Sequence, residues 1–366
     1  MVERDFQFAG RTIRVEAPVA EAAWLEEFLS PQFAVSRAGR PDCHARFDVS
    51  PARYTELAAL GPDPGGRLVP CFTLDGGVLA GPAWNVPGET RVVFDEAAQV
   101  FYSRGPAERP TVEVIASEVT PGARVAIMRV VREWAMRHAR RAGWLIAHAA
   151  AVALDGEALV FAGPKGAGKT TLLVHTLLHA AKASFIANDR TGLSLDGDKV
   201  VAAGIPTIVS LRPSTAWDPG QEARLREAQY HHRHTLAEAA TMRQAGTTRP
   251  ASVWSLSPRQ LCQVLGVESS ASAPVRTLVF PSVAPSGAGS IVEPISPEHA
   301  LELLTDATFS VWSPDNLMHI GDDGAPAQDP PPSSQEFVGR VHSIRCRLGP
   351  EAYRGGMPWL DRLRLR

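Results

Sequence analysis

The first 120 residues alternate apolar and polar positions over short stretches, a pattern typical of β-strands that bury one face. The alternation is clearest in TRVVFD (90–95) and QVFYSRG (99–105), which acidic turn residues separate and which together predict a hairpin. One clear helix is expected at VAEAAWLEEFLS (19–30). We therefore predict a mainly β, α+β N-terminal domain over residues 1–120, in which no motif carries chemistry.

After residue 120 the apolar residues recur with the period of an α-helix. Ile127, Val130 and Trp134 recur at helical spacing, and Gly143 stands where a helix C-cap belongs. Arginines populate the other sides of this helix: Arg124, Arg129, Arg132, Arg137, Arg140 and Arg141. A solvated basic face is the favoured interpretation, and a surface that receives an acidic substrate is the alternative.

A hairpin is expected next, because two apolar runs in WLIAHAAAVALDGEALVFAG flank Asp155–Gly156. It leads into FAGPKGAGKTTLL (161–173), in which Gly163, Gly168, Lys169 and Thr170 fit the P-loop pattern G-x-x-x-x-G-K-[ST]. In such loops the backbone N–H groups surround phosphate oxygens, the lysine neutralises the outer phosphates and the hydroxyl binds Mg²⁺.

Two of the four lysines in the chain, Lys165 and Lys169, lie in this loop, which favours a phosphate site over the alternative of a Gly-rich surface turn. The helix that follows adds its N-terminal dipole. The residues predicted to bind the nucleotide phosphates here are Gly163, Pro164, Lys165, Gly166, Ala167, Gly168, Lys169, Thr170 and Thr171.

An apolar strand, ASFIAND, follows the helix and ends on Asp189. A carboxylate at such a strand end lies beside the loop, so we predict that Asp189 and Thr170 hold Mg²⁺. An aspartate that only starts a turn is the alternative. The next stretch, RTGLSLDGDKVVAAG, predicts a second hairpin and thus a strongly sheet-based core.

Residues 143–205 resemble the HPr kinase/phosphorylase group, whose core is similar to phosphoenolpyruvate carboxykinase. Members carry a histidine about fifteen residues ahead of the loop, and His148 stands fifteen before Gly163. The resemblance implies an α/β nucleotide-binding core that uses ATP and Mg²⁺, with His148, Lys169 and Asp189 as catalytic residues. Recognition of the HPr protein itself is not implied, because the group's downstream signature loop has no match. Relatives in peptide-natural-product clusters phosphorylate serine on a peptide, so the substrate class differs widely.

The chain departs from that group at two places. Asn188 occupies the position of the group's acid/base aspartate, and an amide cannot take a proton. Either His148 or Asp189 then assumes that role, or nucleotide binds without efficient transfer. The group's downstream signature loop has no match; GIPTIVSLRPS stands in that region, where Arg212 is a candidate phosphate contact and a surface salt bridge is the alternative.

Two functions follow as expectations. The first is a kinase that moves the γ-phosphoryl of ATP to a hydroxyl of a peptide, protein or small molecule. The second is a nucleotide-gated binding module without efficient transfer, which Asn188 favours. A GTPase is disfavoured because no N-K-x-D motif occurs, and a transporter ATPase because no L-S-G-G-Q segment follows.

The predicted nucleotide-binding core spans residues 121–321. Within it, 218–240 predicts a polar, partly helical cover, 275–283 a late strand and 296–309 a capped helix. The cover contains His231, His232 and His234, whose spacing favours a polar lid over a metal site. A Pro-rich linker is expected at 322–336, followed by an edge strand (337–349) and a basic tail within 337–366.

The composition bears on the partners, the cellular compartment and the state of the cysteines. Of 366 residues, 45% are hydrophobic and 21% charged, and the net charge of −2 gives no reason to expect nucleic-acid or membrane partners. MVERDFQFAG has no apolar signal segment, so a cytoplasmic protein is expected. The four cysteines lack C-x-x-C pairing and predict buried thiols rather than a metal or disulfide framework. Homo-oligomerisation is left open.

Overall fold

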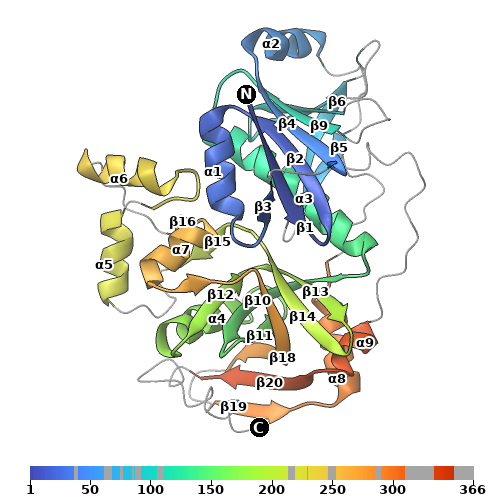
Figure 1. Ribbon diagram of the computed structural model, residues 1–366, viewed down its shortest axis with the longest axis vertical. Coiled ribbons are helices and arrows are strands. Elements are labelled where there is room, and N and C mark those ends of the chain that lie inside the picture. Colours follow the sequence, from blue (N-terminus) through green and yellow to red (C-terminus); the bar gives the residue numbers. More distant parts are fainter. Residues whose placement is uncertain are drawn as a thin grey trace. The chain divides into compact units, whose positions relative to one another are not determined.

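The computed structural model describes residues 1–36, 40–61, 68–74, 77–84, 86, 92–104, 111–212, 219–228, 230–245, 253–284, 290–309 and 334–349. The chain is a mixed α/β protein with two compact units (Figure 1). The first contains the described residues within 1–27 and 33–142, and the second those within 28–32, 143–309 and 330–366. The predicted boundary at residue 121 is therefore replaced by one at Gly143.

The described strands of the first unit form a nine-stranded sheet in the order β3-β1-β2-β4-β9-β8-β7-β6-β5. Their bounds are β1 (Val2–Phe8), β2 (Arg11–Ala17), β3 (Ala34–Ser36), β4 (Cys43–Val49), β5 (Leu68–Leu74), β6 (Gly77–Trp84), β7 (Val92–Asp95), β8 (Val100–Arg104) and β9 (Thr111–Ala116). The predicted hairpin is confirmed, because β7 pairs with β8 from Val92↔Ser103 to Asp95↔Val100.

The helices of this unit are α1 (Val19–Leu29), α2 (Pro51–Leu60) and α3 (Pro121–Arg141). The sequence predicted α1 and α3 and missed α2. Its start signal was present, since the Ser50 side chain accepts from the Arg53 N–H and Pro51 occupies the first turn. α3 packs on β2, β4 and β9, which explains why it belongs to this unit.

The basic residues of α3 correct the prediction of a solvated face. Arg124, Arg132, Arg137 and Arg140 are all buried. Arg124 forms a two-pronged ion pair with Glu21 of α1, at 2.5 and 3.1 Å. Burial of a guanidinium is sustained by such pairing, and a period count along one helix cannot show that an acid on another helix lies opposite.

The second unit is built on another nine-stranded sheet, in the order β17-β12-β10-β13-β14-β18-β20-β19, with β11 between β10 and β18. Its strands are β10 (Leu145–Leu154), β11 (Glu157–Ala162), β12 (Ala183–Ala187), β13 (Arg190–Asp196), β14 (Lys199–Ile205), β17 (Glu268–Ser269), β18 (Ser272–Val283), β19 (Ile291–Pro294) and β20 (His342–Leu348). β15 (Val209–Leu211) and β16 (Trp254–Leu256) form a separate two-stranded sheet.

The helices of the second unit are α4 (Lys169–His179), α5 (Pro219–Ala228), α6 (Leu236–Gln244), α7 (Pro258–Leu265), α8 (Pro297–Asp306) and α9 (Ser334–Val338). Alternate residues of β10 enter two different cores. Ala150 and Val152 pack with Leu172 of α4, whereas Ala149 and Ala151 belong to the core of α8 and α9. The sheet therefore has helices on both faces.

Both hairpins predicted in this unit are confirmed. β10 pairs with β11 up to Leu154↔Glu157, and φ is positive at Asp155 (52°) and Gly156 (86°), as a type I′ turn requires. β13 pairs with β14 in the same antiparallel manner. The predicted capped helix is α8, in which the Ser296 hydroxyl accepts from the His299 N–H.

The C-terminal predictions need correction. β20 is not an edge strand, because it lies between β18, to which it is parallel, and β19. It thus belongs to the core sheet of the second unit. The predicted linker ends within α9, since Ser334–Glu336 are helical. Residues 322–333 of that linker and the basic tail 350–366 lie outside the described residues.

Candidate functional site

The glycine-rich loop connects β11 to α4, as the sequence predicts. Three of its glycines have positive φ: 152° at Gly163, 85° at Gly166 and 100° at Gly168, which is the N-cap of α4. An added Cβ at Gly166 would meet no atom within 4 Å, so the backbone angle rather than space calls for glycine there. An alternation of left-handed and ordinary residues is the backbone geometry of anion-binding nests in proteins, and in this chain it lies at the N-terminus of α4.

Lys169 is the first residue of α4 and is buried. Its ammonium donates to the carbonyl oxygens of Gly163 (2.7 Å) and Pro164 (2.9 Å), which open the loop. Lys165 is exposed at the tip of the loop together with Pro164 and Gly166. The two lysines therefore differ in burial: Lys169 is buried and Lys165 is exposed.

His148 is joined to the loop through the backbone. It lies on β10, and its carbonyl oxygen accepts from the N–H of Gly163 at 3.3 Å. Its own N–H donates to the carbonyl of Ala307 at 2.6 Å, so the N–H and the carbonyl of His148 are both hydrogen-bonded. The structure thus brings the predicted histidine to the start of the glycine-rich loop.

Asn188 and Asp189 form the bend between β12 and β13. These two strands pair with successive parts of β10. β12 pairs with Ala151–Leu154 of β10 and β13 with Leu145–His148. Between these two ladders, the N–H of Ala149 donates to the carbonyl of Asp189 at 3.1 Å. The bend therefore lies beside β10, next to His148.

The two side chains of this bend have different partners. Thr170 donates its hydroxyl proton to Oδ1 of Asn188 at 3.1 Å. Oδ1 of Asp189 lies 3.1 Å from Nε2 of His148. The sequence predicted Asp189 beside Thr170, whereas the structure places the amide there and the carboxylate at the histidine.

Two residues near this pair were missed by the sequence analysis. Arg190 is buried, and its Nε lies 3.8 Å from Oδ2 of Asp189. The ring of Phe309 lies 4.9 Å from the Arg190 guanidinium carbon and 5.2 Å from the His148 ring. Arg190 could have been noticed because it follows Asp189 directly, but nothing in the sequence marks Phe309.

Arg212 and Thr171 were both predicted to contact phosphate, and the structure gives their positions without testing that role. Arg212 is exposed and directly follows β15, in the two-stranded sheet rather than the large one, so its phosphate contact stays a prediction. Thr171 lies half-buried in the first turn of α4.

The histidine cluster of the predicted cover is anchored to α7. Gln260 donates to the carbonyl oxygens of His231 (3.0 Å) and His234 (2.8 Å). Burial lowers the pKa of His232 to about 3, with a smaller contribution from His231. Among the residues that the structure describes, no group of histidine, cysteine and acidic side chains could hold a metal ion.

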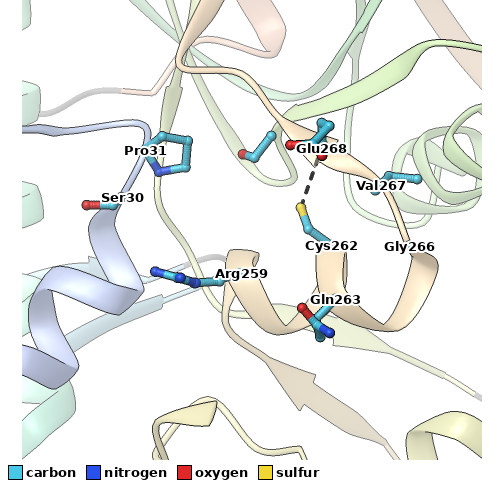
Figure 2. A pocket seen from close by; sticks show the side chains of 9 residues that line it. Ser30, Pro31, Arg259, Cys262, Gln263, Gly266, Val267 and Glu268 are labelled. Atoms are coloured by element: carbon cyan, nitrogen blue, oxygen red, sulfur yellow. Dashed lines mark hydrogen bonds between the residues drawn. The ribbon is translucent and has the colours of Figure 1, made fainter. Parts of the chain in front are cut away.

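A cavity of about 580 Å³ lies elsewhere in the second unit, between α7, β17 and the turn at Ser30–Pro31 (Figure 2). No residue of the glycine-rich loop lines it. Its wall includes the thiol of Cys262, whose pKa burial raises to about 12, so the sulfur stays protonated and unreactive. Cys43, Cys262 and Cys346 are free and buried, as predicted.

Comparison with known proteins assigns the chain to no family. No protein-family model matches the chain, and no curated protein does so. In the described part of the chain, none of the helices has the length and apolar character needed to span a membrane.

Proposed function

We propose that the second unit binds ATP with Mg²⁺ and transfers its γ-phosphoryl group to a hydroxyl. The observation that carries the proposal is the placement of a histidine–carboxylate pair at the start of a glycine-rich loop. The His148 carbonyl accepts from the Gly163 N–H, and its ring pairs with Asp189. Phosphoryl transfer needs an anion-binding loop and a nearby proton acceptor, and this arrangement supplies both.

Lys169 and the loop would bind the phosphates of ATP. The lysine ammonium now donates to the carbonyls of Gly163 and Pro164, and it would exchange these two bonds for phosphate oxygens. Backbone N–H groups around Gly166 and Gly168 and the N-terminus of α4 would bind the remaining charge.

The residues beside Thr170 suit Mg²⁺. This ion prefers oxygen ligands, and the Thr170 hydroxyl and the Asn188 amide oxygen lie 3.1 Å apart. When bound, Mg²⁺ neutralises charge on the β- and γ-phosphates. Asp189, predicted from sequence as the metal-side acid, is assigned instead to the proton-transfer pair because of its contact with His148.

His148 is the proposed proton acceptor. A carboxylate can only accept a hydrogen bond, so the proton of neutral His148 lies on Nε2, which faces Asp189. Nδ1 then carries the lone pair that takes the proton of the acceptor hydroxyl as its oxygen bonds to the γ-phosphorus and ADP leaves. Asp189 stabilises the imidazolium that forms.

A second function is favoured by one observation. Asn188, a neutral amide, contacts Thr170 at the position where the group that residues 143–205 resemble carries an aspartate. The unit would then bind ATP as a switch without transfer. The two functions are separated by following ADP and phosphomonoester formation by ³¹P NMR, with Mg²⁺ and a panel of serine peptides, sugars and glycerol. Transfer that the Asp189→Asn variant lacks supports the kinase, and bound ATP that stays intact with every acceptor supports the switch.

A further inference from the structure

Four side chains from three separate segments meet in the first half of β10: His148, Asp189, Arg190 and Phe309. We call them the His148 cluster. Asp189 lies at its centre, with Oδ1 3.1 Å from Nε2 of His148 and Oδ2 3.8 Å from Nε of Arg190. The two oxygens of one carboxylate thus face two different nitrogen groups.

The backbone fixes Arg190 and Phe309 beside the histidine. Arg190 is the register partner of His148 in the antiparallel pair of β10 and β13, so their side chains share a face of the sheet. The segment before Phe309 runs along the other side of the histidine: Ala307 accepts from the His148 N–H, and the Phe309 N–H donates to Ile146 at 2.8 Å.

Phe309 is a common support for both nitrogen groups. Its ring lies 4.9 Å from the guanidinium carbon of Arg190, within the range of a cation–π contact, and 5.2 Å from the His148 ring. Arg190 is only 6% exposed, so its guanidinium has little room to leave this arrangement. The positive charge of the Arg190 guanidinium attracts a carboxylate, such as that of Asp189, far more strongly than it attracts a neutral amide.

We propose that Arg190 and Phe309 are positioning residues that hold the Asp189 carboxylate at His148. Asn188 and Asp189 are adjacent in the bend, and their places in the chain direct their side chains to different partners. The charge of Arg190 then holds the Asp189 carboxylate in its contact with the histidine. The catalytic meaning of this contact rests on the proposed function, but the positioning itself does not.

The direct readout is the imidazole Nε2–H of His148 in ¹H–¹⁵N NMR spectra, assigned by its loss in His148→Gln. A hydrogen bond to Asp189 protects this proton from exchange with water. We expect the signal in the wild type, its loss in Arg190→Gln and its weakening in Phe309→Leu. Arg190→Lys keeps the charge but not the planar contact, and should restore part of the signal.

Arg276→Gln is the matched control, because Arg276 also pairs with an acid, Glu157, at 3.8 Å but lies away from the cluster on β18. It should leave the His148 signal unchanged. In the transfer assay, Arg190→Gln should lower kcat about 10- to 100-fold with the KM for ATP changed less than about twofold, because the proton acceptor is disturbed and the loop is not.

An unchanged His148 signal in both Arg190→Gln and Phe309→Leu would overturn the inference. If Arg190→Gln does not fold, Phe309→Leu and Arg190→Lys decide the same question, since both keep the buried volume nearly filled. A wild type that shows the expected signal changes but never transfers phosphate would refute the proposed kinase and leave the positioning role standing.

Discussion

Thr170 and Asn188 are joined by a hydrogen bond of 3.1 Å from the threonine hydroxyl to the amide oxygen. This bond connects the first turn of α4 to the bend between β12 and β13. It brings two neutral oxygen atoms together at the proposed Mg²⁺ site, whereas the neighbouring carboxylate of Asp189 contacts His148.

Lys169→Ala should remove most of the stabilisation that ATP gives. Saturation at one hundred times Kd stabilises a protein by about 2.7 kcal/mol, and the buried ammonium of Lys169 is the charge closest to the loop carbonyls. Thermal unfolding with and without ATP·Mg²⁺ measures the effect. Lys165→Ala is the control: it removes an exposed lysine of the same loop and should reduce the shift less. Equal shifts in the wild type and Lys169→Ala would refute the phosphate-binding role of the loop.

Asn188→Asp should tighten the magnesium dependence of ATP binding. The change puts a carboxylate beside the Thr170 hydroxyl, and a charged oxygen binds Mg²⁺ more strongly than an amide oxygen does. We expect the Mg²⁺ concentration at half-maximal binding to fall about tenfold, in calorimetric titrations at fixed ATP. A midpoint that does not move would place the metal away from Asn188.

His175 should make the protein sensitive to acid. Burial, with a smaller contribution from His179, lowers its pKa from 6.5 to about 4 in the folded state. Between these values the unfolded chain binds a proton that the folded chain does not, so the free energy of unfolding falls as the pH drops from about 6.5 to about 4. The contribution lost between pH 7 and pH 5 is about 2 kcal/mol.

Urea unfolding at pH 7 and pH 5 tests this effect. His175→Gln should lose less stability on acidification than the wild type, and the sensitivity that persists includes His232, whose pKa is lowered to about 3. His179→Gln is the comparison: His179 is exposed on the same helix and makes only the smaller contribution to the pKa of His175, so this variant should lose nearly as much stability as the wild type. If all three proteins lose the same stability, His175 is not a source of acid sensitivity.

Gly204→Ala should destabilise the second unit by about 1–3 kcal/mol. An added Cβ would lie 2.1 Å from the carbonyl oxygen of Ile186 on β12 and 2.6 Å from Cγ of Gln32, and the backbone oxygen cannot move without shifting the strand. Gly197→Ala is the comparison, since its Cβ meets no atom within 4 Å and only its φ of 62° opposes the change. Its cost should be about 1 kcal/mol. Equal urea midpoints for the two variants would contradict the close contact.

Local features of this protein could be predicted from the sequence, because each depends on neighbouring residues. The Asp155–Gly156 turn requires two positive φ angles, which that dipeptide adopts readily, and the glycine-rich loop carries its own spacing. The placement of His148 ahead of the loop and of the bend at Asp189 after it followed from a hairpin and a nearby strand. These elements are close in the chain and pair in simple register.

Contacts between distant segments could not be predicted. Phe309 reaches His148 only because the chain after α8 runs along β10. Arg124 is buried because Glu21 lies opposite it on another helix. Arg190 and Phe309 lie beside the His148–Asp189 pair through sheet pairing and a distant segment, so the motif located the bend at Asn188 and Asp189 but not the contact of Asp189 with His148.

The most direct test of the account exchanges the two residues of the bend. The double variant Asn188→Asp/Asp189→Asn keeps one carboxylate and one amide but puts the carboxylate at Thr170 and the amide at His148. Phosphoryl transfer from ATP to a hydroxyl acceptor is measured in single-turnover experiments, with ATP affinity measured in parallel. We predict transfer by the wild type and a loss of about 10²-fold or more in the exchanged variant, with ATP still bound. Equal transfer by both proteins, or bound ATP that neither protein consumes, would contradict the account.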